Sequence, residues 1–139
     1  MAAGYLLDTN VISETRRSRA DQGVIAFLFA AEGTSLFVSV LTMGELRKGV
    51  EAKRRVDPIV AESLKQWVDG IETSFADRIL PVSTAIARIW GEQTAIRSLP
   101  VIDTLIAATA IAHDLALVTR NTKDTEHTGV QLINPWQQR

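Results

Sequence analysis

Short apolar runs alternate along the chain with longer segments in which apolar residues recur three and four positions apart. The short runs are bounded by polar residues, Gly or Pro, and they predict strands at residues 5–7, 36–40, 78–82, 115–119 and 130–134. The longer segments predict helices with one buried face. Strands that lack in–out alternation and are separated by helices indicate a mainly parallel sheet covered on both faces. We therefore predict an α/β fold, a single α/β/α sandwich with about five strands.

Composition limits the class of protein. A chain of 139 residues, 46% of them hydrophobic, suits one domain over residues 1–139, with residues 1–4 as a loose leader. Its apolar runs are shorter than the ~20 residues that a membrane-spanning helix needs, so we expect a cytoplasmic protein without a membrane partner. The absence of cysteine excludes disulfides and cysteine metal sites. The net charge of −1 means that any nucleic-acid binding needs a local basic patch.

Acidic residues fall at the ends of predicted elements. In open parallel sheets, ligands bind outside the carboxyl ends of the strands. One carboxylate follows the first strand, one lies early in the helix after the second strand, one heads an apolar helix, and one follows the fourth strand. These residues are Asp8, Glu45, Asp103 and Asp124. We expect the fold to bring them together.

Each carboxylate also has an ordinary structural interpretation. Asp8 can cap a helix, Asp103 can interact with a helix dipole, and Glu45 and Asp124 can be surface charges. Taken together they favour a metal site, because carboxylates forced together among apolar neighbours repel one another unless a cation joins them. Oxygen ligands without cysteine suit Mg²⁺ or Mn²⁺. A typical reaction of such a site is metal-assisted hydrolysis of a phosphodiester.

The ordered motifs LLDTNVISE, SVLTMGELRKGV, IDTLIAATA, LVTRNTKD and INPW resemble the PIN-domain superfamily, in particular VapC-type toxin ribonucleases and FitB-like members. The order and spacing match over residues 5–136. The resemblance implies a Mg²⁺- or Mn²⁺-dependent endoribonuclease that cleaves RNA as the toxin of a toxin–antitoxin pair. It also implies a homodimer and a cognate VapB-like antitoxin that binds operator DNA and forms a larger assembly. By position, Asp8, Glu45 and Asp103 match the three best-defined acidic residues of the family.

The fourth acidic position is ambiguous. Some family members have an acid directly after the Thr-Arg pair, where this chain has Asn121, whereas others have Asn there and an Asp three residues later, as Asp124 is here. We expect Asp124 to contribute to the metal site and Asn121 to organise the loop. Thr9, Asn10 and Thr119 are expected to hydrogen-bond within the site.

Two basic groups lie near these motifs. Arg16, Arg17 and Arg19 follow the first motif, and residues 53–55 follow the helix of Glu45. They are either solvated surface or contacts for RNA phosphates. No aromatic-rich stretch accompanies them, which favours recognition of RNA shape over base stacking.

Two further alternatives remain open at this point. The segment VIAFLFAAEG at residues 24–33 is so apolar that it predicts either a central core helix or a helix that also docks an antitoxin or a second subunit. The chain as a whole is either a nuclease or a catalytically silent PIN-like module that binds nucleic acid or protein. An aspartyl-phosphate phosphatase fits poorly, because Asn10 stands where that pattern needs a second Asp.

Overall fold

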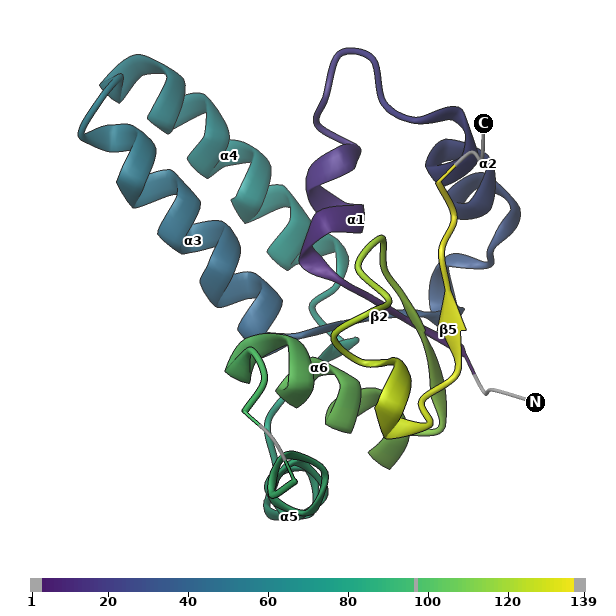
Figure 1. The fold of residues 1–139 in the computed structure, drawn as a ribbon. Helices are drawn as coiled ribbons and strands as arrows, with labels where there is room; N and C mark the ends of the chain where they lie inside the picture. The colour runs from purple at the N-terminus through teal and green to yellow at the C-terminus, as the bar shows by residue number, and fades with distance from the viewer. Residues whose placement is uncertain (1–3, 97, 137–139) are drawn as a thin grey trace.

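One parallel sheet forms the centre of the molecule (Figure 1). The computed structural model describes residues 4–96 and 98–136, and within them five strands are ordered β3-β2-β1-β4-β5. The strands are β1 (Gly4–Leu7), β2 (Leu36–Ser39), β3 (Ile79–Leu80), β4 (Leu115–Val118) and β5 (Leu132–Ile133). All four pairings are parallel. The predicted α/β/α sandwich with about five strands is therefore confirmed.

Helices connect the strands, and most of them begin at a polar cap. They are α1 (Thr9–Glu14), α2 (Gln22–Ala30), α3 (Val40–Arg54), α4 (Pro58–Ser74), α5 (Thr84–Thr94) and α6 (Val101–Ala112), with short 3₁₀ turns η1 (Gly33–Ser35) and η2 (Glu126–Thr128). Side-chain oxygens of Asp21, Ser39, Asp57 and Ser83 accept hydrogen bonds from free N–H groups at the starts of α2, α3, α4 and α5. Figure 1 shows α3 and α4 as a long antiparallel pair that extends to one side of the sheet.

The core has two parts, one on each face of the sheet. Alternate residues of the central strand point to opposite faces, so Leu7 packs with buried residues of α1, α2, α3 and α4, whereas Leu6 packs with those of α6. Helix α5 covers the outside of α6, where the indole N–H of Trp90 donates to Thr104 Oγ1 at 2.9 Å. Strands buried on both faces explain the absence of alternation in the sequence.

Helix α2 is buried on one side only. Val24 is fully buried, and Tyr5 contacts Phe27 edge-on with ring centroids 5.1 Å apart. In contrast, Phe29 is 91% exposed and Ile25 is 40% exposed. The interpretation of this segment as a central core helix is therefore wrong, and its outer side is free to contact another chain.

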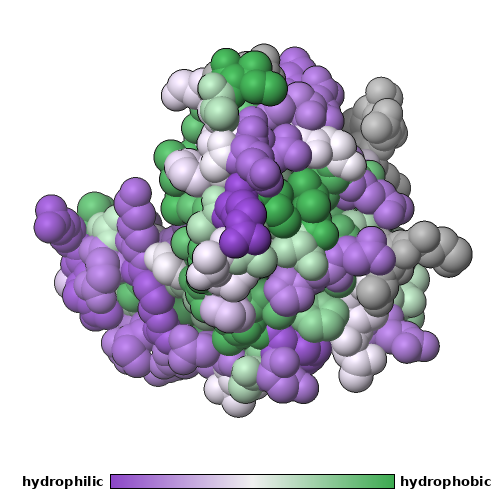
Figure 2. All heavy atoms as spheres, turned by 90° about the horizontal axis from the view of Figure 1, so that it is seen from below, coloured by the Kyte–Doolittle hydropathy of each residue, from purple (hydrophilic) through white to green (hydrophobic). Residues whose placement is uncertain are grey.

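The surface is otherwise mixed in polarity. Figure 2 shows hydrophilic side chains dominating the left edge of the face seen from below, where Figure 1 places α3 and α4. Over the described ranges, none of the helices combines the length and the apolar character that crossing a bilayer requires.

The N-terminal boundary differs from the prediction. Residues 1–3 of the expected leader lie outside the described residues, but Gly4 begins β1 and pairs with Leu115. A Cβ atom on Gly4 would lie 2.7 Å from the backbone oxygen of Ser35. Glycine at this position therefore allows the close approach of β1 to the segment before β2.

We expect Gly4→Ala to destabilise the protein by roughly 1–3 kcal/mol, because the added methyl group meets a backbone atom that cannot move independently. Thermal unfolding followed by circular dichroism measures the change. Gly70→Ala is the matched control, since a Cβ at this position in α4 meets nothing within 4 Å. The control should gain up to about 1 kcal/mol from helix propensity. Equal melting temperatures for both variants would contradict the close approach at Gly4.

Candidate functional site

The sheet topology creates a crevice at the carboxyl ends of β1 and β4. Connections from β1 lead to β2 and β3 on one side, while β4 and β5 lie on the other, so the strand order reverses between β1 and β4. Asp8 follows β1 and Thr119 follows β4, and the backbone N–H of Asp8 donates to the Val118 oxygen at 3.0 Å. The first predicted acidic residue therefore lies at the switch point of the sheet.

Asp8 is both a helix cap and a member of the crevice. It is 9% exposed, and its Oδ1 accepts from the Thr9 N–H at 2.8 Å while its Oδ2 accepts from Thr119 Oγ1 at 2.7 Å. Burial raises the pKa of Asp8, the hydrogen bonds from Thr119 and Thr9 lower it, and the charge of Glu45 raises it further; the net direction is upward. The carboxylate is thus held in a fixed orientation in a partly dry environment.

Glu45 and Asp103 approach the crevice from two helices on opposite faces of the sheet. Glu45 lies in the second turn of α3, and its Oε1 accepts from Thr9 Oγ1 at 2.5 Å. Asp103 lies in the first turn of α6 and is partly buried. Its pKa is raised to about 6, first by burial and then by the charges of Asp8, Glu45 and Asp124. The carboxylates of four separate segments therefore act on one another here.

The loop after β4 connects the fourth acid to the first. Thr119 Oγ1 accepts from the Asn121 N–H at 3.1 Å and from Asn10 Nδ2 at 3.3 Å, in addition to donating to Asp8. Asn121 Nδ2 in turn donates to Asp124 Oδ2 at 2.7 Å. Asn121 therefore orients Asp124, and the two candidates for the fourth position are neighbours in one hydrogen-bonded chain.

Among the described residues, no Lys or Arg side chain forms an ion pair with the carboxylates of the crevice. Across residues 4–96 and 98–136, the ion pairs of Lys and Arg involve other carboxylates than Asp8, Glu45, Asp103 and Asp124. Nor do any three acidic or histidine side chains in these ranges approach closely enough to enclose a metal ion by themselves. Because Mg²⁺ retains several waters and binds through a few carboxylates, this all-oxygen donor set fits a hydrated hard cation.

The basic group after the first motif is divided between two surfaces. The Arg16 guanidinium lies 5.6 Å from the centre of the Trp67 ring on α4. Arg17 pairs instead with Glu14 at 3.3 Å, and Arg17 and Arg19 line a pocket on the other side of α1. In the second basic group, Arg54 pairs with acidic residues of α3 and α4, as expected for solvated surface.

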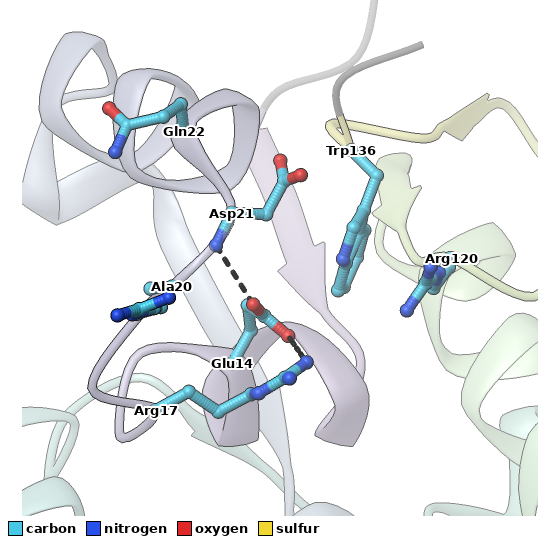
Figure 3. A pocket seen from close by; sticks show the side chains of 8 residues that line it. Glu14, Arg17, Ala20, Asp21, Gln22, Arg120 and Trp136 are labelled. Atoms are coloured by element: carbon cyan, nitrogen blue, oxygen red, sulfur yellow. Dashed lines mark hydrogen bonds and ion pairs between the residues drawn. The ribbon is translucent and has the colours of Figure 1, made fainter. Parts of the chain in front are cut away.

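The pocket beside α1 contains residues that the sequence reasoning missed. Figure 3 shows it between the Glu14–Arg17 pair and the side chains of Arg120 and Trp136. Glu14 is 5% exposed, and its position three residues after buried Val11 was the available signal that it faces inward. Trp136 lies far from Arg17 and Arg19 in sequence, so the sequence alone did not indicate that it lines the same pocket.

Comparisons with known proteins agree with this geometry. The sequence profile of the PIN domain matches residues 5–129. VapC ribonuclease Y4jK of Sinorhizobium fredii is 33% identical, over 95% of this chain and 97% of that protein. Toxin FitB of Neisseria gonorrhoeae is 35% identical, over 94% of this chain and 97% of that protein.

Solved structures extend the likeness to three dimensions. The crystal structure of FitAcB from Neisseria gonorrhoeae has a chain with a TM-score of 0.79 and 34% identity, which covers 96% of this chain and 99% of its own length. A structure of FitAB bound to an IR36 DNA fragment gives a TM-score of 0.80 at 32% identity, with 97% of each chain covered. A profile match over most of the sequence and full-length relatives at about one-third identity establish that the chain belongs to the PIN domain family.

Proposed function

We propose that the protein is a Mg²⁺- or Mn²⁺-dependent endoribonuclease and the toxin of a type II toxin–antitoxin pair. The observation that carries this proposal is the gathering of Asp8, Glu45, Asp103 and Asp124 at the carboxyl edge of a parallel sheet, where Asp103 experiences the charges of the other three. The similarity to a VapC ribonuclease and to the FitB toxin supports the same activity.

Asp8, Glu45, Asp103 and Asp124 would hold the cation. When bound, it supplies a Lewis acid for the phosphate and an activated water. The chain's own residues set the geometry: Thr119 fixes Asp8, Thr9 fixes Glu45, and Asn121 fixes Asp124.

Because the pKa of Asp103 is about 6, this residue is ionised at neutral pH and holds a proton below that value. We expect activity to fall as the pH drops below about 6.

Arg16, Arg17 and Arg19 are proposed contacts for RNA phosphates. Positive side chains beside the crevice offset the repulsion between its carboxylates and the substrate. Since Arg16 lies over Trp67 while Arg17 and Arg19 line the pocket beside α1, these contacts would flank α1 on two sides.

We test the nuclease activity by incubating the purified protein with structured and single-stranded RNAs in the presence of Mg²⁺, Mn²⁺ or EDTA. Cleavage is expected with either metal and not with EDTA. The double variant Asp8→Asn/Asp103→Asn, purified in parallel, controls for a contaminating ribonuclease and should be inactive. If no RNA is cleaved under any metal condition, the alternative of a catalytically silent PIN-like binding module is favoured.

The proposed partners are a second copy of the chain, as a homodimer, and a VapB-like, operator-DNA-binding antitoxin. The FitAB relative bound to DNA supports such an assembly, and the exposed side of α2 with Phe29 offers apolar surface for it. Adding the product of the neighbouring gene should inhibit RNA cleavage. Unchanged cleavage, together with separate elution of the two proteins in size-exclusion chromatography with light scattering, would argue against an antitoxin role for that product. Light scattering of the protein without the antitoxin gives its mass and so tests the proposed homodimer.

A further inference from the structure

A polar pocket of about 280 Å³ lies beside α1, between the loop that joins α1 to α2 and the segment after β5. The residues that line it include three arginines, two carboxylates and one indole, which are Arg17, Arg19, Arg120, Glu14, Asp21 and Trp136. Figure 3 shows Arg120 and Trp136 facing the Glu14–Arg17 pair across this pocket. The pocket is therefore formed by residues 14–22 from the N-terminal part of the chain and by Arg120 and Trp136 from the C-terminal part.

The two carboxylates of the pocket are already used by the protein. Glu14 Oε2 accepts from the Asp21 N–H at 2.8 Å and its Oε1 pairs with Arg17 at 3.3 Å. Asp21 Oδ1 accepts from the N–H groups of Gly23 and Val24 at the start of α2. These acids thus hold the loop after α1 in shape, and their hydrogen-bonding capacity is directed mainly into the protein.

The arginines make the pocket suitable for an anion. Across residues 4–96 and 98–136, neither Arg19 nor Arg120 forms an ion pair with a carboxylate. The Arg120 guanidinium lies over the Trp136 ring, 5.2 Å from its centre. Three arginines against two carboxylates give a local positive excess in a chain whose net charge is −1. Guanidinium groups with unused donors are well matched to phosphate oxygens.

The pocket adjoins the carboxylate crevice. Arg120 directly follows Thr119, whose hydroxyl donates to Asp8, and the Arg120 N–H donates to Asn10 Oδ1 at 3.4 Å. Glu14 is the last residue of α1, a six-residue helix that spans roughly 9 Å. A single bound strand can therefore pass from the pocket to Asp8.

We propose that this pocket is an RNA subsite, in which Arg17, Arg19 and Arg120 hold a backbone phosphate and Trp136 stacks on the base of an unpaired nucleotide that flanks the cleaved bond. The inference rests on the proposed function and adds that the strand entering the site is single-stranded there. A base must be unstacked from its neighbours before an indole can stack on it. An acidic protein segment would use the arginines but has no aromatic base for Trp136, so RNA is the occupant that uses the whole pocket.

The test measures binding separately from cleavage. The full-length chain carrying Asp103→Asn, kept in EDTA so that RNA remains intact, is titrated into a fluorescently labelled single-stranded oligoribonucleotide and followed by anisotropy. Arg120→Gln is expected to weaken binding by about fivefold or more and to reduce the slope of log affinity against log salt by about 1. Trp136→Leu is expected to weaken binding by at least about fivefold through lost stacking.

Matched variants make the outcome specific. Arg88→Gln removes the same charge from an exposed position on α5, remote from the pocket, and should leave binding unchanged. Because Trp136 also packs against the main hydrophobic cluster, Trp136→Phe is included, and it should retain most of the binding. A duplex RNA of the same sequence should be insensitive to Trp136→Leu.

The binding results either support or contradict the proposed RNA subsite. Wild-type-like binding of the oligoribonucleotide by folded Arg120→Gln or by folded Trp136→Leu would overturn it. So would a poly-glutamate peptide whose binding depends on Arg120 when RNA binding does not, since the pocket would then take an acidic protein segment. Loss of RNA binding in the pocket variants supports the subsite even if wild type cleaves no RNA. That last combination would refute the proposed nuclease function and not the subsite.

Discussion

Asp103→Asn should reduce metal-dependent RNA cleavage by at least about 10³-fold and, in EDTA at pH 7.5, make the protein more stable than wild type. The activity falls because the variant loses a charged oxygen ligand, and several kcal/mol of metal-assisted catalysis depend on such ligands. The stability rises because the wild-type carboxylate is partly buried beside the charges of Asp8, Glu45 and Asp124. A residue that serves only the fold would show a loss of stability instead.

The pH dependence of unfolding checks the second half of this prediction. The pKa of Asp103 is raised from 3.8 to about 6 in the folded state, so the folded protein binds the proton more tightly than the unfolded chain. Asp103 therefore makes its full contribution to the free energy of unfolding below about pH 4, and this contribution is lost as the pH rises through 6. After allowance for solvent screening at this part-exposed residue, we expect the loss to be about 1–2 kcal/mol.

Chemical denaturation between pH 4 and pH 8, with and without Mg²⁺, measures these effects. In EDTA the decline in stability with pH should be smaller in Asp103→Asn than in wild type, with the remainder from Asp8, whose pKa is also raised. Mg²⁺ should stabilise wild type more than the variant. Asp114→Asn is the matched control, since Asp114 lies at the opposite end of β4 and its φ of 52° suits Asn. A destabilised Asp103→Asn with normal cleavage would contradict the metal-site assignment.

Much of the fold could be predicted because its signals are local. Apolar runs without alternation identified all five strands to within a few residues. The strand-end rule then located Asp8 at the switch point of the sheet. Gly4 escaped prediction because its reason is a backbone contact with Ser35, which the sequence alone does not indicate.

The surroundings of the carboxylates depend on contacts distant in sequence. The hydrogen bonds from Thr9 to Glu45 and from Thr119 to Asp8 join residues 36 and 111 positions apart. The positions of these threonines suggested a role in the site. The partner of Thr119 follows only from the register of β1 against β4, and that of Thr9 only from the pairing of β1 with β2, which α3 follows. The pairing of β5 with β4 explains why Trp136, read as part of a terminal motif, lies beside arginines near the other end of the chain.

Thr119→Val should lower the cleavage rate by about 10–100-fold although Thr119 would not itself contact the metal or RNA. Thr119 is 1% exposed, and its hydroxyl donates to Asp8 Oδ2 and accepts from the N–H of Asn121. Valine keeps the shape but leaves these groups without a partner, which should also cost about 1–3 kcal/mol of stability. The loss of the hydrogen bond raises the pKa of Asp8, so the acid limb of the pH–rate profile should move to higher pH.

Two further variants separate this positioning role from general destabilisation. Thr119→Ser retains the hydroxyl and should restore most of the activity and the wild-type pH profile. Thr109→Val makes the same change at a fully buried threonine whose hydroxyl donates to Leu105 O within α6, and its pH profile should remain that of wild type. A Thr119→Val enzyme that melts earlier but keeps the wild-type rate and acid limb would mean that the hydroxyl serves the fold alone. A displaced acid limb, restored by serine, would mean that β4 positions Asp8 for catalysis through this one hydrogen bond.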